Sequence, residues 1–529
     1  MYPPDTCSCG RRHPGRCADA VGCNTLASGA CSHAEGRATV ASGFASHAEG
    51  ARNTASGGRS HVEGGGIDER GHAAPNEARG SGSHAEGVNT LAAGFGAHAE
   101  GGTVDVTVGP GSQALGDFSH AEGQRTLANG ISCHAEGGLT IASGLNAHAE
   151  GLSTVASNIS AHAEGSSTTA SGSAAHAEGE GTTAFGEASH AEGDGTRAIG
   201  LISHAEGGFG NTASGRFSHV EAGGADPTGR GAPNLVSGPS AHAEGVGTLA
   251  RGFASHAEGG TPDITVSPGP RATGDFAHAE GGSTVASGDF SHAEGLQTST
   301  GGLPGSHIMG QYGTADAAWS WHLGNGIPGT PGLAARIDAA LAQGIATNGW
   351  VAGPADYAEM FETVDGKPID VGYFTAISGD DGRVRKANSR DADVLGITSV
   401  APAFLADAHE LEWKDKWLRD EWGRWLLQEV TIPPVLAEDG SIVTPERTER
   451  QRVVNPDYDG RRSYVPRSRR PEWVAVGLLG KLRVRDDGTC HPGGRCRPND
   501  AGVATNADTG YRVLQRTGPN QVLVLFRAV

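Results

Sequence analysis

The sequence is poor in large apolar and aromatic side chains. Only 5% of its 529 residues are aromatic and three are Met. No apolar run reaches the eighteen or so residues of a transmembrane helix, so we expect no membrane span. Basic residues do not cluster and the net charge is -20, which argues against nucleic-acid binding. The N-terminus lacks the apolar segment of a signal peptide, so we expect synthesis in the cytoplasm without one.

The few aromatic residues are unevenly placed. All eight Trp lie between Trp319 and Trp473, and six of the seven Tyr lie beyond residue 300. A core with large side chains is therefore expected only in the C-terminal part, and the first part needs another means of stabilisation.

Glycine is abundant, at 85 residues, and much of it belongs to a repeat. Residues 32–300 read G-x-x-T-x-A-S-G-x-x-S-H-A-E-G, with seventeen His-x-Glu units. From His120 to His204 the spacing is fourteen residues without a break. A fixed period of this kind indicates a stacked repeat architecture.

Fourteen residues are too few for two helices and a turn. Two strands of about five residues and two tight turns use them up, so each unit predicts one rung of a parallel β-solenoid, or β-roll, rising about 4.8 Å per rung. The predicted fold class is all-β, with a mostly β C-terminal domain of limited helix after the solenoid. The core of Ala, Ser and Thr is thin, which favours association into a homotrimer. The repeat loosely resembles those of trimeric adhesin heads and phage fibres.

His and Glu of each unit are two residues apart and share one face of a strand. Stacked rungs then give a His column beside a Glu column. A ladder of His–Glu hydrogen bonds and a column of metal sites are the two interpretations. Seventeen equivalent sites argue for architecture rather than catalysis.

Four inserts of eight or nine residues interrupt the period, and they match in pairs. The histidines from His61 to His134 recur 158 positions later, from His219 to His292. The array is therefore internally duplicated. Loops that leave a rigid scaffold are common binding sites. The alternative is that the inserts have no function and are merely tolerated by the fold.

Residues 1–31 are rich in Cys. Cys7, Cys9, His13 and Cys17 are close enough in sequence for a small zinc site, and disulfides are equally open. This end is the expected attachment point, on a virion or on the baseplate of an injection machine.

Residues 301–347 form the expected junction. Leu333, Ile337, Ala340 and Leu341 follow a helical spacing, which predicts a short helix or coiled-coil neck. Residues 348–529 contain strand-like segments separated by Asp-Gly turns, which predicts a mostly β domain.

Residues 355–362 read A-D-Y-A-E-M-F-E, and residues 476–481 read V-G-L-L-G-K. With these motifs, residues 348–529 resemble the intramolecular chaperone auto-processing domain, of glutamic-peptidase type, that ends phage pre-neck appendage proteins and related bacterial fibres. Such fibres also often carry repeats rich in His-Ala-Glu-Gly.

The resemblance implies that the domain trimerises, helps the fibre to fold in register and then cuts its own chain near its start. It implies Glu359 as general base or acid, with Asp356 as its partner or as the residue after the cut, and Glu362 in reserve. Carboxylates with different pKa values can share such roles. The family's processed bond is Ser-Asp, and Ala355–Asp356 takes its place here. No cofactor is required for this cleavage.

The sequence thus predicts a structural fibre of a virion, outside the cell, that contacts a host-surface glycan or protein and cleaves itself near Asp356. The alternative is a surface adhesin or glycan-binding fibre whose C-terminal domain is a silent trimerising cap. A metal-loaded structural fibre is a further possibility.

Overall fold

The computed structural model describes residues 14–341, 343–348, 351–411, 413–436, 442–444 and 446–527. It divides into a first unit, Met1–Asn348, and a second unit, Gly349–Val529. No helix among these residues is long and apolar enough to cross a membrane.

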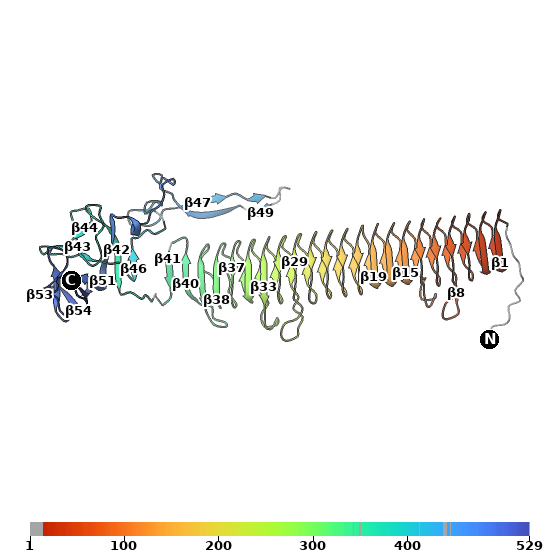
Figure 1. The fold of residues 1–529 in the computed structure, drawn as a ribbon, viewed down its shortest axis with the longest axis horizontal. Coiled ribbons are helices and arrows are strands. Elements are labelled where there is room, and N and C mark those ends of the chain that lie inside the picture. The colour runs from red at the N-terminus through yellow and green to blue at the C-terminus, as the bar shows by residue number, and fades with distance from the viewer. Residues whose placement is uncertain are drawn as a thin grey trace. The chain divides into compact units, whose positions relative to one another are not determined.

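The first unit is a parallel β-solenoid, as predicted (Figure 1). Each rung contributes one strand to each of two parallel sheets. The strands that begin at the His of the repeat form the His sheet, and the strands that follow the Thr of the repeat form the Thr sheet. Most strands span two residues, as β5 (His47–Ala48) does in the His sheet and β4 (Val40–Ala41) in the Thr sheet. The longer strands of the His sheet are β1 (Asp19–Cys23), β3 (His33–Arg37), β15 (His120–Gln124), β17 (His134–Gly138), β19 (His148–Leu152), β33 (His256–Gly260), β35 (His278–Gly282), β38 (His307–Gln311) and β39 (Trp321–Asn325).

The register pairs each residue with the one a repeat later. His120 lies opposite His134 in the His sheet, and Leu127 lies opposite Ile141 in the Thr sheet. Parallel pairing extends from β1 to β39, so rungs without the His-x-Glu signature continue the stack at both ends. The hydrogen bonds between rungs join backbone groups, so a rung of any sequence can form them if its length fits the repeat.

Small side chains fill the interior of the solenoid. Most strands point one fully buried Ala inward, as Ala128 and Ala135 do, and Ser and Thr side chains such as Ser119 and Thr126 are buried as well. A buried methylene stabilises by about 0.8 kcal/mol, so such a core contributes far less per residue than one of Leu or Phe. Close approach of the rungs is obligatory, because a Cβ added at Gly130 would lie 2.2 Å from the carbonyl oxygen of Gly144.

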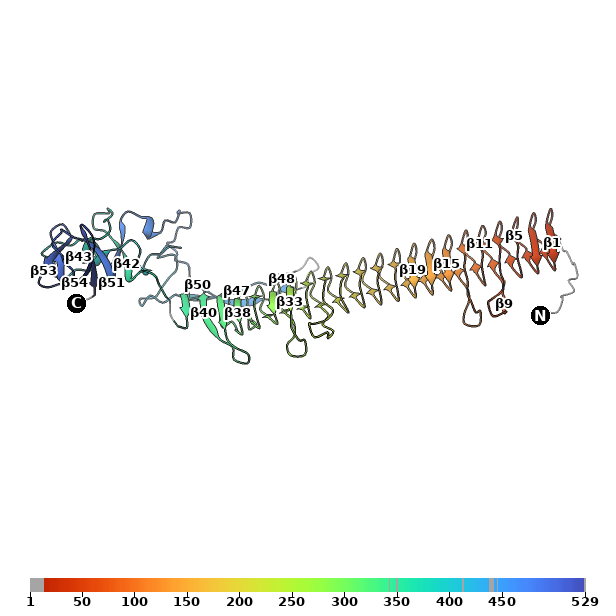
Figure 2. The ribbon, with the colours of Figure 1, turned by 60° about the horizontal axis from the view of Figure 1, so that its bottom comes forward.

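The inserts leave the turn edge that follows the His-x-Glu strands, and Figures 1 and 2 show them on the same side of the solenoid. Asn replaces the usual Thr in the two rungs beside the first insert of each half of the array. The amide of Asn53 donates to the carbonyl oxygens of Glu49 and Gly64, both at 2.7 Å, and Asn211 repeats this position 158 residues later. These amides satisfy carbonyl groups where the chain departs from the stack.

The predicted helix after residue 332 is wrong. Residues Leu333–Asp338 form strand β40, antiparallel to β39 and to β41 (Gln343–Ala346). In the sheet, the backbone of this segment gains hydrogen-bond partners on both sides. These partners outweigh the weak local preference for a helix that the apolar spacing indicated.

The second unit is an antiparallel β domain. Its main sheet runs β44-β43-β45-β51-β55-β54-β52-β53, and β42 lies between β51 and β46. Its helical content among the described residues is the single 3₁₀ turn Arg467–Arg469. The strands are β42 (Asp356–Glu362), β43 (Phe374–Ser378), β44 (Arg383–Lys386), β45 (Gly396–Thr398), β46 (Phe404–Ala406), β47 (Leu427–Ile432), β48 (Val435–Leu436), β49 (Ile442–Thr444), β50 (Arg447–Arg452), β51 (Trp473–Arg485), β52 (Arg495–Pro498), β53 (Ala504–Ala507), β54 (Tyr511–Gly518) and β55 (Gln521–Phe526).

Candidate active site

The Ala355–Asp356 peptide lies at the start of β42 and is held by backbone hydrogen bonds on both sides. The N–H of Lys481 donates to the carbonyl oxygen of Ala355 at 3.2 Å. The N–H of Ala403 donates to the carbonyl oxygen of Asp356 at 2.8 Å. The bond that the sequence singled out is therefore fixed between β51 and the segment that leads into β46.

The side chain of Asp356 is buried, with 7% of the residue exposed. Its Oδ2 has no hydrogen-bond partner among the described residues. A Cβ added at Gly477 would lie 2.5 Å from Cδ2 of Leu482 and 3.3 Å from Oδ2 of Asp356, so a larger residue there would displace these side chains. A buried carboxyl oxygen without a partner is costly, and such groups are often retained for chemistry.

Asp356 lines a cavity of about 690 Å³ whose rim is basic. Lys481, Arg483 and Arg485 contribute positive charge to it. The guanidinium of Arg485 is engaged with the carboxylate of Asp370 and with the carbonyl oxygen of Val371. Lys481 and Arg483 are exposed and line the same cavity as the Ala355–Asp356 peptide.

Glu359 points away from this cavity. Burial alternates along β42, and residues an odd number apart face opposite sides of a strand, so Asp356 and Glu359 diverge. Oε1 of Glu359 accepts a hydrogen bond of 2.6 Å from the hydroxyl of Tyr357. That bond raises the pKa of Tyr357, because the neighbouring carboxylate disfavours loss of the phenolic proton.

Glu362 ends β42 opposite Trp473 in the ladder. It is six residues from Asp356, a distance of about 20 Å along an extended strand. Within one chain, the structure therefore brings none of the three predicted carboxylates together.

Sequence reasoning assigned no individual role to Tyr357, Lys481 or Gly477. Side chains two residues apart share a face of a strand, so a strand through residues 356–362 places Tyr357 beside Glu359. Tyr357 could have been identified in this way. The other two come from β51, and only the pairing of β42 with β51 brings them to Asp356.

The N-terminal candidates are mostly outside the described residues. Cys7, Cys9 and His13 lie there, so the zinc site remains a prediction. Cys17 is exposed with a free thiol, and Cys23 is disulfide-bonded.

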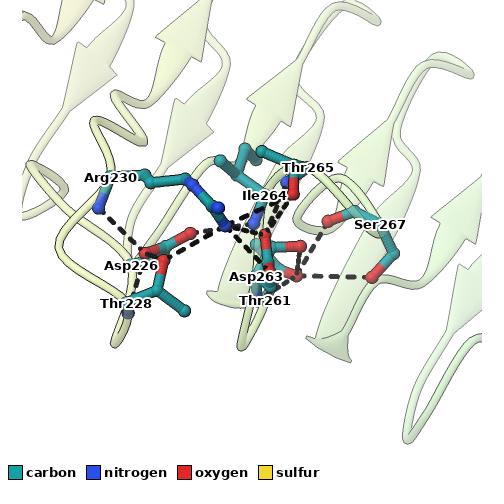
Figure 3. A network of polar contacts seen from close by, with 8 residues as sticks. All are labelled: Asp226, Thr228, Arg230, Thr261, Asp263, Ile264, Thr265 and Ser267. Atoms are coloured by element: carbon teal, nitrogen blue, oxygen red, sulfur yellow. Dashed lines mark hydrogen bonds and ion pairs between the residues drawn. The ribbon is translucent and has the colours of Figure 1, made fainter.

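The insert loops form a second candidate site, and consecutive inserts are joined by polar contacts (Figure 3). Oδ1 of Asp226 accepts hydrogen bonds from the Thr228 hydroxyl at 2.6 Å and from the N–H of Arg230 at 3.1 Å. Nη1 of Arg230 then lies 2.9 Å from Oδ1 of Asp263 in the next insert. The paired loops have a defined conformation, as a recognition surface requires.

Comparison with known proteins identifies the C-terminal part. Residues 334–521 match the family model of Peptidase_G2, the IMC autoproteolytic cleavage domain. The preneck appendage protein of Bacillus phage PZA is 37% identical over 139 residues, which cover 26% of this chain and 15% of the phage protein. The pre-neck appendage protein of Bacillus phage phi29 is 36% identical over 156 residues, which cover 29% and 16%.

The putative phage-related protein YobO of Bacillus subtilis is 32% identical over 164 residues, which cover 30% of this chain and 19% of YobO. This chain thus spans less than a fifth of the length of these relatives. Among solved structures, the C-terminal fragment of phi29 gene product 12 is 32% identical, with a TM-score of 0.26 and coverage of 32% of this chain and 99% of that chain. Pre-mature gene product 12 is 16% identical, with a TM-score of 0.41 and coverage of 96% and 68%.

Residues 334–521 thus match the model of the IMC autoproteolytic cleavage domain, and the relatives of this part of the chain include pre-neck appendage proteins of Bacillus phages.

Proposed function

We propose that this chain is the shaft of a phage-type appendage, and that its C-terminal unit guides assembly and then cuts its own chain at Ala355–Asp356. The match of residues 334–521 to an autoproteolytic family carries this proposal. The fixed peptide and the buried carboxyl of Asp356 support the position of the cut. Cleavage that follows folding would leave the shaft kinetically trapped.

The proposed chemistry is of the glutamic-peptidase type. One carboxyl group activates water and another protonates the leaving nitrogen. Because Glu359 faces away from Asp356 within one chain, we propose that the pair is completed between subunits, with Glu359 of one subunit acting beside Asp356 of its neighbour. Cleavage would then wait for correct assembly.

The solenoid carries its own support for association with further copies of the chain. Apolar side chains gather at the turn edge that precedes each His, and Phe95 and Phe118 there are 53% and 60% exposed. Their rings lie 5.2 Å apart, as do those of Phe253 and Phe276 in the second half of the array. Contiguous exposed aromatic groups of this kind mark interfaces, and the thin Ala core needs one. A homotrimer is the assembly that we propose.

We also propose that the free end contacts a host surface and the N-terminal end attaches to the virion. A permanent adhesin with a silent cap is the second candidate, and the ordered insert pairs favour it. The two candidates differ in whether the chain is cut.

Intact mass of the purified chain tests the proposal. The wild type should yield a fragment ending at Ala355, and Asp356→Asn and Glu359→Gln should stay at full length. Mixing the two variants during refolding should restore some cleavage if the carboxyl groups act between subunits. A wild-type chain that remains whole after prolonged incubation as an oligomer would overturn self-cleavage and leave the adhesin.

A further inference from the structure

The outer face of the His sheet carries a continuous column of imidazole and carboxylate groups, here called the His–Glu column. Neighbouring rings stack in parallel, with centroids 4.8 Å apart for His84 and His98 and 4.7 Å apart for His98 and His120. The column consists of the seventeen His-x-Glu pairs that begin at His33, His47, His61, His84, His98, His120, His134, His148, His162, His176, His190, His204, His219, His242, His256, His278 and His292.

At several rungs of the column, namely those of His84, His120, His190 and His278, Nε2 lies within 4.0 Å of two carboxylates, one from its own rung and one from the preceding rung. Nε2 of His120 is 3.5 Å from Oε2 of Glu122 and 3.8 Å from Oε1 of Glu100. Nε2 of His190 is 3.9 Å from Oε2 of Glu192 and 3.4 Å from Oε1 of Glu178. The geometry repeats because the register repeats.

These distances are too long for hydrogen bonds, which place the two heavy atoms at about 2.7–3.2 Å. Nε2 of most column histidines, including His98, His120 and His134, is shielded from solvent and has no hydrogen-bond partner among the described residues. The hydrogen-bonded ladder that the sequence suggested is therefore formed at only a few rungs, as between His278 and Glu258 at 2.9 Å.

The carboxylates also crowd one another, because they stack in register at the spacing of the rungs. Ionised carboxylates at this separation repel one another, and a cation between them would offset that repulsion.

We infer that the His–Glu column binds divalent transition-metal ions of the Zn²⁺ class, each held by one imidazole Nε2 and carboxylate oxygens of two successive rungs. Zn²⁺ takes such ligands at about 2.0–2.2 Å, which separates tetrahedral ligand atoms by about 3.3 Å. The Nε2–Oε separations of 3.4–3.9 Å at His120 and His190 are close to that value. Ca²⁺ and Mg²⁺ prefer sites made only of oxygen.

The column offers many such sites. Groups whose ligand atoms lie within 4.8 Å of one another include His98, Glu100 and His120, and also His120, Glu122 and His134, so a second imidazole from the next rung is within reach as a further ligand. Ions at such positions would join consecutive rungs on the outside of a solenoid whose interior holds mainly small side chains. Metal binding would thus stabilise the shaft, independently of the C-terminal unit.

Metal stoichiometry of the full chain tests the inference. The protein is stripped with EDTA, dialysed against Zn²⁺ alone and analysed for zinc by mass spectrometry. A block variant changes six consecutive ligands to Gln, namely His120, His134, His148, His162, His176 and His190. A second block variant changes Glu122, Glu136, Glu150, Glu164, Glu178 and Glu192 to Gln. The control changes Ser143, Ser157 and Ser171, each of which follows a strand of the Thr sheet, to Ala.

We expect several zinc ions per wild-type and control chain, and loss of about a third of them from either block variant. EDTA should lower the melting temperature of the wild type more than that of the block variants. Wild type that binds one ion or none, or folded block variants that bind as much as the wild type, would overturn the inference. If neither block variant folds, the wild-type stoichiometry alone decides. Self-cleavage is read from fragment mass and is tested separately.

Discussion

The backbone N–H of Ile264 donates to Oδ2 of Asp226 at 2.9 Å, across 38 residues of sequence. The N–H of Val106 donates to Oδ2 of Asp68 at 3.1 Å across the same separation. One buried carboxylate in each half of the array thus ties two consecutive inserts together. Asp226 is therefore one link between the two inserts of its pair, beside the ion pair of Arg230 and Asp263.

Asp226→Ala should loosen both inserts of the second pair. The Thr228, Arg230 and Ile264 donors lose their shared acceptor, so amide exchange in residues 226–230 and 261–267 should rise roughly tenfold. Exchange in the neighbouring rungs should stay unchanged. Asp194→Ala, at an exposed position, is the control. Loosening of the first insert alone would contradict the proposed coupling.

The same loops should be sensitive to acid. Hydrogen bonds from the Thr228 hydroxyl and from the N–H of Ile264 lower the pKa of Asp226 to about 2. An unfolded Asp titrates near pH 3.9, so this carboxylate stabilises the loops above about pH 4, and the effect is lost as the pH falls through 2. Hydrogen exchange, corrected for intrinsic rates, should show the loops loosening over that range. In Asp226→Asn the pH dependence should be weaker.

Gly477→Ala should slow self-cleavage. The added Cβ would contact Leu482 and Oδ2 of Asp356, which displaces the carboxyl group from its place beside the Ala355–Asp356 peptide. We expect the full-length chain to persist, measured as the fraction cut over time in folded oligomers. Gly460→Ala is the matched control, because an added Cβ there makes only an ordinary contact, 3.6 Å from Tyr458. Equal rates in the two variants would argue against a role for the Asp356 carboxyl group.

Overfilling the solenoid should destabilise it. Ala135 is fully buried between rungs and leaves no room for a larger side chain, so Ala135→Leu should lower the free energy of unfolding by about 1–3 kcal/mol. Ile131→Ala, at a side chain 53% exposed, should have a smaller effect on an isolated chain. Denaturant unfolding of both variants checks this. A larger effect for Ile131→Ala would instead place that side chain in an interface between subunits.

Self-cleavage should depend on assembly if Glu359 acts on a neighbouring subunit. Dilution during refolding should then lower the rate at which the fragment ending at Ala355 appears, because encounter of chains precedes the cut. Time courses at several protein concentrations, followed by intact mass, measure this. A rate independent of concentration would indicate that one chain suffices.

The sequence by itself determined the repeating part of this protein. A period of fourteen residues with Gly at both turns leaves room only for two short strands per rung, and a repeated register follows from a repeated spacing. The matched inserts and the shared face of His and Glu could be derived in the same way, because each depends on local spacing.

Only the tertiary structure decided the rest. Residues 333–338 form a strand because β39 and β41 supply partners on both sides, which local spacing does not reveal. Asp356 and Glu359 are near in sequence but diverge, because pairing with β51 makes residues 356–362 an extended strand. Lys481 and Gly477 reach Asp356 through the same long-range pairing. Such contacts depend on which segments meet, and nothing within the segments themselves specifies that.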